Sequence, residues 1–362
     1  MKLKILDRYL IKNFLLTYFF VAFVIVLIIC MIDYTEKIDN FLDKKAPVRA
    51  ILLDYYLNLI PYWINYISPL MVFIATVFFT SRIAARTEIV AMLSSGISFG
   101  RILLPYFAGA TVLGIITFIM VGWILPKANK VRNGFEQTYV KDEFYFSGRN
   151  VHIKIAPQVY AYLESYNVAT KTGSKFTLET IEGNSLRAKL SADRIVWQPD
   201  KNKWAIHDYR IRTLDSLSPR ESLSYGTLID TTLNLSPKDF ESNYNLFQTF
   251  TLPELNEYIE RLRSRGADGL EVYLIEKYTR FTQPFAILIL TAIGVIVSAR
   301  KSRRGVGWQI AVGFVLAFIY ILFFLLSKGV AEAGNINTLL AVWLPNIIFS
   351  FIGLVLFKTL PR

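Results

Sequence analysis

Six long stretches without charged residues constrain this chain most, because each is long enough to cross a lipid bilayer. A hydrocarbon core is about 30 Å thick, so a spanning helix needs roughly 20 apolar residues. Hydrophobic residues make up 53% of the chain, above the usual range for a soluble domain. We therefore predict an α-helical membrane protein with spans at Phe14–Ile32, Ile60–Thr80, Ile102–Leu125, Phe281–Ser298, Trp308–Leu326 and Leu339–Phe357.

The distribution of charge predicts how these spans are oriented. The formal net charge is +12, and almost all of it lies at the two termini and in the segments between spans two and three and between spans four and five. By the positive-inside rule these segments face the cytoplasm, so both termini are expected there. Since the basic excess follows from topology, and no basic patch is interleaved with stacking aromatic residues, no nucleic-acid partner is predicted.

The long segment between spans three and four has a β pattern. Apolar and polar residues alternate strictly over Leu186–Asp193, as a strand with one buried face requires. Turn-forming residues separate Trp197 from Trp204, which indicates a hairpin. Several short antiparallel strands predict a sandwich or jellyroll domain inserted between the third and fourth helices.

A helix is expected after this β domain. Thr251 and Glu254 have capping-box spacing, Leu255 and Ile259 begin an apolar face, and Gly266 suits the carboxyl-terminal cap. The predicted organisation is three spans with a short cytoplasmic helix at about 81–98, a β-jellyroll, an amphipathic helix with connector, and three further spans, at residues 1–125, 126–250, 251–280 and 281–362.

No motif for a catalytic site or a bound cofactor is present in the sequence. Cys30 is the sole cysteine, and His152 and His207 are the only histidines, so neither a disulfide nor a cysteine or histidine metal cluster is expected. Walker A, nucleophile-elbow and zinc-protease motifs are absent. The predicted spans also contain no ionisable residue, unlike many ion-coupled transporters. Energy for any transport is therefore expected from a partner protein.

The cytoplasmic loop between spans two and three predicts a short amphipathic helix. Thr87 or Ser81 is placed to cap it, and Gly96 to end it. An apolar face of Ile89, Met92 and Leu93 suits docking in a groove of a partner protein. The same pattern also suits a helix that lies on the lipid surface. Composition alone leaves both interpretations open.

The motif Glu88-Ile89-Val90-Ala91-Met92-x-x-Ser95-Gly96 resembles the coupling-helix signature of the LptF/LptG permeases, which belong to the lipopolysaccharide-export ABC transporter. Leu6-Asp7-Arg8-Tyr9 with Lys12 resembles the amino-terminal opening of the LptG half in particular. Residues 59–88 and 258–266 are also similar, so the resemblance covers essentially the whole chain.

The resemblance implies a permease that pairs with a second LptF/LptG subunit and binds an LptB-like cytoplasmic ATPase dimer. Such a pair extracts lipopolysaccharide from the outer leaflet of the inner membrane of a Gram-negative bacterium. ATP is then used by the partner, and this chain binds no cofactor itself. The inserted jellyroll is implied to be periplasmic and to join similar domains, LptC and LptA, edge to edge.

The resemblance also implies candidate site residues. Those expected to couple the chain to the ATPase are Arg86, Glu88, Ala91, Met92 and Gly96. Lys37, near the outer end of span one, is a candidate for contact with the lipid headgroup, and a solvated charge is the alternative. Tyr320 in span five is a candidate for lining the lipid cavity, and a packed or lipid-facing tyrosine is the alternative. This chain departs from LptG-like sequences by carrying Asp33 close to where they have a lysine.

Two other functions fit the same pattern of spans. An envelope scaffold or sensor would use the helices as an anchor and the β domain to bind a partner. An ABC exporter for a different lipid or lipoprotein would share the coupling loop and differ in cargo. Co-purification with an ATPase separates the first alternative from a permease, and reconstitution with defined lipids separates the second.

Overall fold

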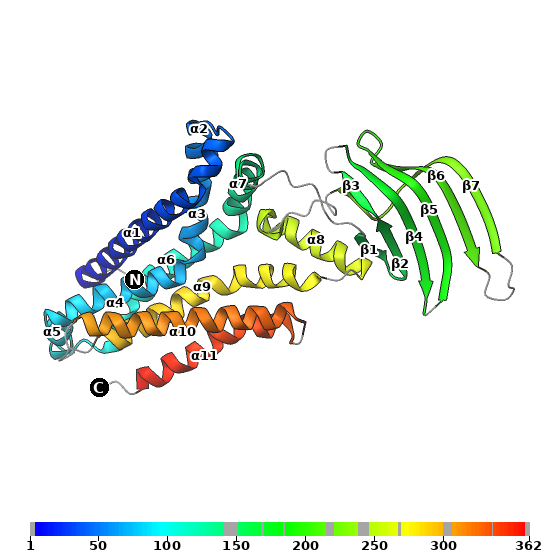
Figure 1. Ribbon diagram of the computed structural model, residues 1–362. Coiled ribbons are helices and arrows are strands. Elements are labelled where there is room, and N and C mark those ends of the chain that lie inside the picture. The colour runs from blue at the N-terminus through cyan, green and yellow to red at the C-terminus, as the bar shows by residue number, and fades with distance from the viewer. Residues whose placement is uncertain are drawn as a thin grey trace. The chain divides into compact units, whose positions relative to one another are not determined.

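The structure is a computed structural model that describes residues 4–140, 151–167, 170–183, 185–214, 221–237, 246–266, 269–299, 306–334 and 336–358. It comprises two compact units (Figure 1). The helical unit contains Met1–Val140, Phe247–Leu252 and Glu271–Arg362. The sheet unit contains Lys141–Leu246 and Pro253–Leu270.

The helical unit confirms the six predicted spans, since six helices in the described ranges are long and apolar enough to cross a membrane. Even the shortest, with 18 residues, extends about 27 Å at 1.5 Å per residue. Five of the six extend beyond the charge-free windows. They are α1 (Ile5–Asp43), α4 (Ser68–Ala85), the continuous helix of α6 (Phe99–Ile119), η2 (Met120–Ile124) and α7 (Leu125–Tyr139), α9 (Leu270–Ser298), α10 (Val306–Glu332) and α11 (Thr338–Lys358).

The second predicted span, Ile60–Thr80, consists of two helices. The chain passes from α2 (Val48–Ala50) through the π-helical turn η1 (Ile51–Tyr56) into α3 (Leu57–Tyr66). The helix is interrupted at Ile67, whose φ and ψ are −102° and 12°, and α4 then begins at Ser68. Pro69 lies in the first turn of α4, where its missing N–H removes no helical hydrogen bond. The interruption therefore costs little at this position.

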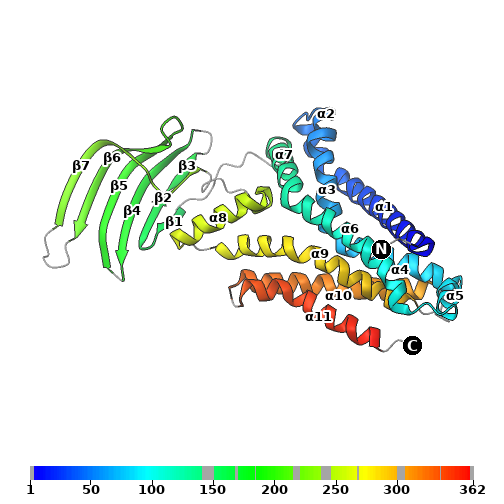
Figure 2. The same ribbon diagram turned by 180° about the vertical axis from the view of Figure 1, so that it is seen from behind.

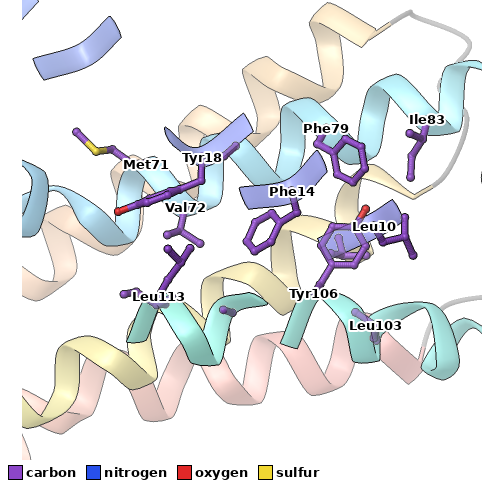
Figure 3. Packing of buried hydrophobic residues seen from close by; sticks show 14 of the residues in the cluster. Leu10, Phe14, Tyr18, Met71, Val72, Phe79, Ile83, Leu103, Tyr106 and Leu113 are labelled. Carbon is purple, nitrogen blue, oxygen red and sulfur yellow. The ribbon is translucent and has the colours of Figure 1, made fainter. Parts of the chain in front are cut away.

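Helix α4 lies at the centre of the bundle. Residues in 67% of its most apolar window are buried, compared with 17% in α1 and 22% in α10. Helices α1 and α10 both pack against α4, and α1 also packs against α6. Figure 3 shows Phe14 and Tyr18 of α1 between residues of α4 and α6, among them Tyr106. The large uncovered surfaces of α1 and α10 remain available to lipid or to another protein.

The helical unit extends along α7 to Val140, beyond residue 125, where the hydropathy pattern places its boundary. Charged residues end the apolar window near Pro126, but the helix continues as an amphipathic segment. Its buried residues include Asn129, Arg132 and Phe135. Hydropathy therefore located the span but not the end of the helix.

In its described residues, the sheet unit contains one antiparallel sheet of seven strands, consistent with the predicted jellyroll (Figure 2). The order is β1-β2-β4-β5-β6-β7, and β3 pairs with β4. The strands are β1 (Val151–Ala156), β2 (Val159–Leu163), β3 (Ser165–Asn167), β4 (Thr172–Glu182), β5 (Ser185–Gln198), β6 (Lys203–Leu214) and β7 (Glu221–Thr231).

The core of the sheet unit forms around the predicted hairpin. Trp197 of β5 pairs with Trp204 of β6, and their rings are 5.0 Å apart, which confirms the hairpin. Trp204 is fully buried and donates a hydrogen bond from Nε1 to the Leu235 carbonyl at 2.7 Å. Phe176 and Ile195 complete the buried centre. The tryptophan therefore contributes both apolar area and a satisfied polar atom.

The predicted helix after the sheet is also confirmed. A short 3₁₀ segment, η4 (Leu246–Thr249), precedes α8 (Leu252–Arg265). Leu255 and Ile259 on the apolar face are 0% and 1% exposed. Gly266 ends the helix with φ +59°, a conformation that residues with a Cβ adopt at a cost.

Candidate functional site

The predicted coupling helix is α5 (Glu88–Ser94), which connects α4 to α6. Its amino-terminal cap does not use a side chain as expected. Thr87 has φ +60° and its hydroxyl donates to the Arg86 carbonyl, while Ser81 lies within α4 and donates to Phe78. At the other end, Gly96 has φ +86° and donates its N–H to the Leu93 carbonyl at 3.0 Å. The predicted role of Gly96 in ending the helix is confirmed.

The apolar residues of α5 divide between two faces rather than forming the single face expected. Ile89 is 1% exposed and Met92 is partly buried, and both pack into the core that α1, α4 and α6 share. Val90 and Leu93 are 53% and 42% exposed. Ala91 is exposed beside them. One face of α5 thus fixes the helix to the bundle, and the other face is available for a partner.

Glu88 joins α5 to the first span. Its Oε2 accepts a hydrogen bond of 2.9 Å from the hydroxyl of Tyr9, and its Oε1 lies 4.0 Å from Nη1 of Arg86. The Glu88 side chain is 29% exposed. Tyr9 is therefore a further functional candidate, which the sequence marks only as part of the amino-terminal motif. Because 79 residues separate it from Glu88, no local pattern indicates their contact.

A second ion pair fixes the amino end of α1 to α6. Arg101 donates from Nη2 to Asp7 Oδ2 at 2.7 Å, and its Nη1 lies 2.7 Å from Asp7 Oδ1. The backbone N–H of Lys4 donates to the same carboxylate at 3.0 Å. Such a two-point arginine contact fixes orientation as well as distance. The starts of α1 and α6 and the helix α5 therefore form one connected group at this end of the bundle.

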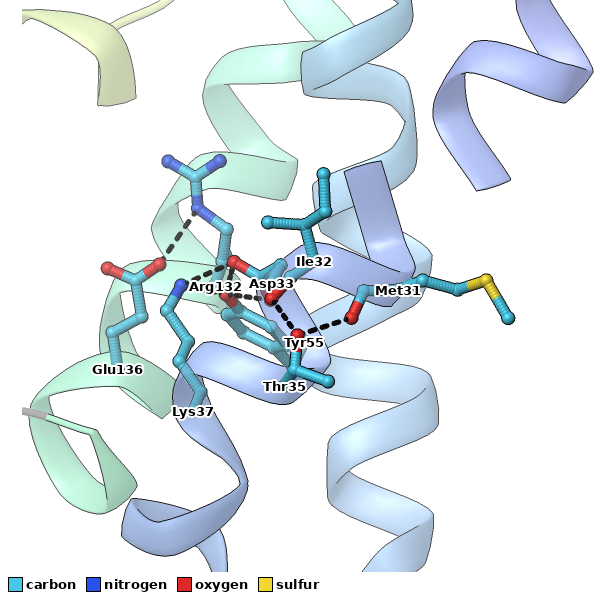
Figure 4. Close-up of polar contacts among 8 residues, drawn as sticks. All are labelled: Met31, Ile32, Asp33, Thr35, Lys37, Tyr55, Arg132 and Glu136. Atoms are coloured by element: carbon cyan, nitrogen blue, oxygen red, sulfur yellow. Dashed lines mark hydrogen bonds and ion pairs between the residues drawn. The ribbon is translucent and has the colours of Figure 1, made fainter. Parts of the chain in front are cut away.

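Lys37 lies in a polar cluster beyond the apolar part of α1 (Figure 4). Its Nζ is 2.7 Å from Oδ1 of Asp33, and it also donates to the hydroxyl of Tyr55. The Lys37 and Asp33 side chains are 19% and 13% exposed. Tyr55 is fully buried and donates to Asp33 at 2.9 Å. Lys37 is thus partnered rather than simply solvated, and Asp33 is its charged partner.

Two buried arginines belong to the same end of the bundle and were not selected from the sequence. Arg132 lies over the ring of Tyr62, with 4.4 Å from Cζ to the ring centroid, and its Nε is 3.5 Å from Glu136. Arg280 is 2% exposed. It donates to Glu276 at 2.9 Å and to the carbonyls of residues 247 and 250 at 3.1 and 2.8 Å. Arg280 thereby holds the returning chain against α9.

Tyr320 borders a cavity of about 170 Å³ inside the helical unit. The tyrosine is 5% exposed, and its hydroxyl donates to Oδ1 of Asn346 at 2.8 Å. Asn346 in turn donates to the Thr282 carbonyl at 3.0 Å. The Tyr320 ring therefore lines the cavity, while the Tyr320 hydroxyl is hydrogen-bonded to Asn346 of α11.

The predicted site residues form separate groups. Arg86, Glu88, Ala91, Met92 and Gly96 lie together on or beside α5, while Lys37 and Tyr320 lie apart from them. Within the described residues, no group of three or more metal-ligating side chains occurs. The geometry around α5 leaves one exposed helix face that is suited to binding a partner.

Comparison with known proteins gives matches over nearly the whole chain. Residues 8–359 match the family described as "Lipopolysaccharide export system permease LptF/LptG". The chain is 19% identical over 355 residues to the "Lipopolysaccharide export system permease protein LptG" of Escherichia coli K12, covering 97% of both chains. It is also 26% identical over 186 residues to an uncharacterized protein of Aquifex aeolicus, covering 49% of this chain and 50% of that protein.

Proposed function

Because the chain belongs to the LptF/LptG family of lipopolysaccharide export permeases, we propose that it is one permease subunit of an ABC transporter that extracts lipopolysaccharide from the inner membrane. The observation that carries this proposal is the extent of the family match, residues 8–359. It includes all six spanning helices and the inserted sheet, so neither unit is left to a different function.

Energy enters through a separate cytoplasmic ATPase that docks on α5. Val90 and Leu93 offer exposed apolar side chains, and the buried Ile89 behind them keeps the helix from moving independently of the bundle. An apolar helix face in a protein groove is a common mode of recognition. Glu88 can then contact both Tyr9 and the ATPase. One carboxylate oxygen accepts the hydrogen bond from Tyr9, and the side chain is still 29% exposed.

The second permease subunit and the lipid path lie along α1 and α10. These are the least covered spans, with 17% and 22% of their apolar windows buried. Phe19, Phe20 and Phe23 of α1 are more than half exposed. Large apolar faces of this kind are suited to lipid or to a companion subunit. A lateral gate between spans one and five of the two subunits fits this distribution.

Lipopolysaccharide leaves through the sheet unit, which on this proposal is periplasmic while both termini are cytoplasmic. Strands β1 and β7 end the sheet, each with one neighbouring strand in the described residues. Free strand edges allow a similar domain to be added by backbone hydrogen bonding. LptC-like and LptA-like jellyrolls are the proposed partners at such an edge.

Lys37 is the proposed contact for a headgroup phosphate, which has to compete with Asp33 for the ammonium group. A photo-crosslinker at position 37 should capture lipopolysaccharide during ATP-driven transport. Absence of the crosslink under transport conditions, with crosslinks forming from other positions on α1, would remove Lys37 from the lipid path and leave the permease assignment intact.

Co-purification tests the assignment as a whole. The full chain, isolated from native membranes, should carry an ATPase and a second permease of the same family, and the complex in proteoliposomes should release lipopolysaccharide only with ATP. Purification of the chain without an ATPase would favour an envelope scaffold or sensor. Transport of another lipid or lipoprotein, with no movement of lipopolysaccharide, would change the proposed cargo.

A further inference from the structure

The cavity beside Tyr320 has a polar side with unused hydrogen-bond acceptors. All the residues that line it belong to the helical unit, on α3, α4, α7, α9, α10 and neighbouring segments. Four lining residues have a buried oxygen with no hydrogen-bond partner in the described structure, namely Asn65 Oδ1, Asn129 Oδ1, Gln248 Oε1 and Thr279 Oγ1. Asn129 as a whole is only 3% exposed.

These oxygens call for a ligand that donates several hydrogen bonds. A buried acceptor without a partner costs about 1–3 kcal/mol, so four in one cavity are unusual without a ligand. The amide nitrogens of Asn65 and Asn129 each already donate a hydrogen bond, Asn65 to Gln283 at 3.4 Å and Asn129 to the Gln248 backbone carbonyl at 3.1 Å. A protonated primary amine has three N–H donors and can satisfy several acceptors at once.

The same cavity is also lined by a cation that has no counter-ion among the residues the structure describes. Lys328 of α10 lines it, is partly buried, and has no hydrogen bond or ion pair with any described residue. The other lining cation, Arg280, is committed to Glu276 and two backbone carbonyls. An anionic group in the ligand would neutralise Lys328 and form a charge-assisted hydrogen bond with it.

The remaining lining is apolar and reaches the surface of the bundle. Leu70, Ala286 and Phe324 contribute hydrocarbon, and Leu325 and Tyr66 at the lining are 47% and 52% exposed. In a spanning helix bundle such a surface meets lipid tails or a neighbouring subunit. A ligand can therefore place a polar head in the cavity and leave its chains in the membrane.

We propose that this cavity binds the headgroup of a zwitterionic phospholipid that carries a primary amine. The ammonium group donates to the unpartnered oxygens, the phosphate pairs with Lys328, and the first acyl carbons lie against the apolar lining. The site is distinct from the lateral face of α1 and from α5, and it shares α10 with the proposed lipopolysaccharide path. The inference goes beyond the proposed function, because its ligand is a resident lipid of the bilayer and not the transported lipid.

Lipid retention measured by native mass spectrometry tests the proposal. The purified full chain, with any companions that co-purify, is placed in nanodiscs of equal phosphatidylethanolamine and phosphatidylcholine. Phosphatidylcholine has the same phosphate, but its quaternary ammonium group has no N–H to donate. The chain should retain phosphatidylethanolamine in preference by about tenfold, as expected for the loss of one charge-assisted hydrogen bond.

Two substitutions locate that preference in the cavity. Lys328→Gln removes the cation, and Thr279→Val removes one acceptor with almost no change of shape. Each should reduce the retained phosphatidylethanolamine by about tenfold. Lys130→Gln is the matched control, because Lys130 is an exposed lysine of α7 outside the cavity, and it should retain lipid as the parent chain does. Unchanged elution in size-exclusion chromatography shows that each variant is folded.

Three outcomes would overturn the proposal. Equal retention of the two lipids by the parent chain would show that the amine is not recognised. In a second mixture, of phosphatidylethanolamine and phosphatidylglycerol, equal retention of the two lipids would also show that the amine is not recognised, because phosphatidylglycerol has a phosphate and no amine. A preference that persists in both cavity variants would place the bound lipid elsewhere and leave the cavity to water only.

Discussion

At the residue scale, the hydrogen bond from Tyr9 to Glu88 is the most direct link between the first span and the helix proposed to meet the ATPase. Tyr9→Phe removes only the hydroxyl. Since Glu88 is partly exposed, we expect a loss below the roughly 1.5–3 kcal/mol typical of a bond to a charged group, about 1 kcal/mol or fivefold in coupling. The chain should still insert and bind the ATPase, while lipopolysaccharide released per ATP falls about fivefold.

Tyr34→Phe is the control for this prediction, because Tyr34 is an exposed tyrosine on the same helix, 45% accessible. It should leave the ratio of transport to hydrolysis unchanged. Glu88→Ala removes the acceptor itself and should weaken coupling at least as much as Tyr9→Phe. If the ratio of transport to hydrolysis is unchanged in both Tyr9→Phe and Glu88→Ala, α1 does not respond to α5 through this hydrogen bond.

The pair of Lys37 and Asp33 yields a second prediction at this scale. Asp33→Asn leaves the partly buried ammonium of Lys37 without a negative partner, which is more harmful than removing both charges. Because the side chains are 19% and 13% exposed, the expected loss of stability is about 1–2 kcal/mol. Thermal unfolding in detergent should show a lower midpoint for Asp33→Asn, and Asp33→Asn with Lys37→Met should recover most of it. If the double variant unfolds at a lower midpoint than Asp33→Asn alone, the loss of stability does not come from the unpaired ammonium of Lys37.

At the element scale, α5 presents Val90 and Leu93 outward while Ile89 holds it in place. Leu93→Asp places a charge on the exposed face and should reduce ATPase co-purification at least tenfold, as expected for an apolar contact in a groove. The fold should persist because Leu93 is 42% exposed. Leu42→Asp, at a 68% exposed leucine of α1, is the control and should retain the ATPase. If both variants retain it, the ATPase does not dock on this face.

The packing of α6 against α1 is a second property of elements. A Cβ added at Gly109 would lie 2.8 Å from the ring of Phe14, which is closer than real Cβ contacts. Gly109→Ala should therefore separate the two helices slightly and cost about 1–3 kcal/mol. Gly134→Ala, later in the same continuous helix with open space around its Cβ position, is the control. We expect a lower unfolding midpoint for Gly109→Ala alone, and equal midpoints would contradict close packing here.

At the scale of the whole molecule, the buried clusters of the spanning helices contain no residue of the sheet among the parts of the chain that the structure describes. Replacing residues 141–246 by a flexible linker should therefore leave a helical unit that inserts and binds the ATPase. Because the proposed route into the jellyroll bridge is then missing, delivery of lipopolysaccharide should be lost. Site-specific crosslinking to the acceptor jellyroll measures this. Delivery by the shortened chain would show that the sheet is not on the lipid path.

The sequence by itself determined the six spans, the inserted antiparallel strands and the short helix between spans two and three. These features depend on local patterns: charge-free windows, alternation with a period of two, and glycine at the end of α5. Resemblance over the whole chain then indicated the permease family. Side-chain composition along a continuous segment was sufficient for each of these conclusions.

Only the tertiary structure decided how those elements are used. The contacts of Tyr9 with Glu88 and of Asp7 with Arg101 join residues 79 and 94 positions apart, and no local pattern specifies them. The pairing of Lys37 with Asp33, by contrast, has helical spacing, but the buried Tyr55 that bonds to both side chains lies 18 residues beyond Lys37 and is brought there by the fold. The outward face of α5 and the cavity beside Tyr320 likewise depend on which helices pack together, and packing is a property of the assembled bundle.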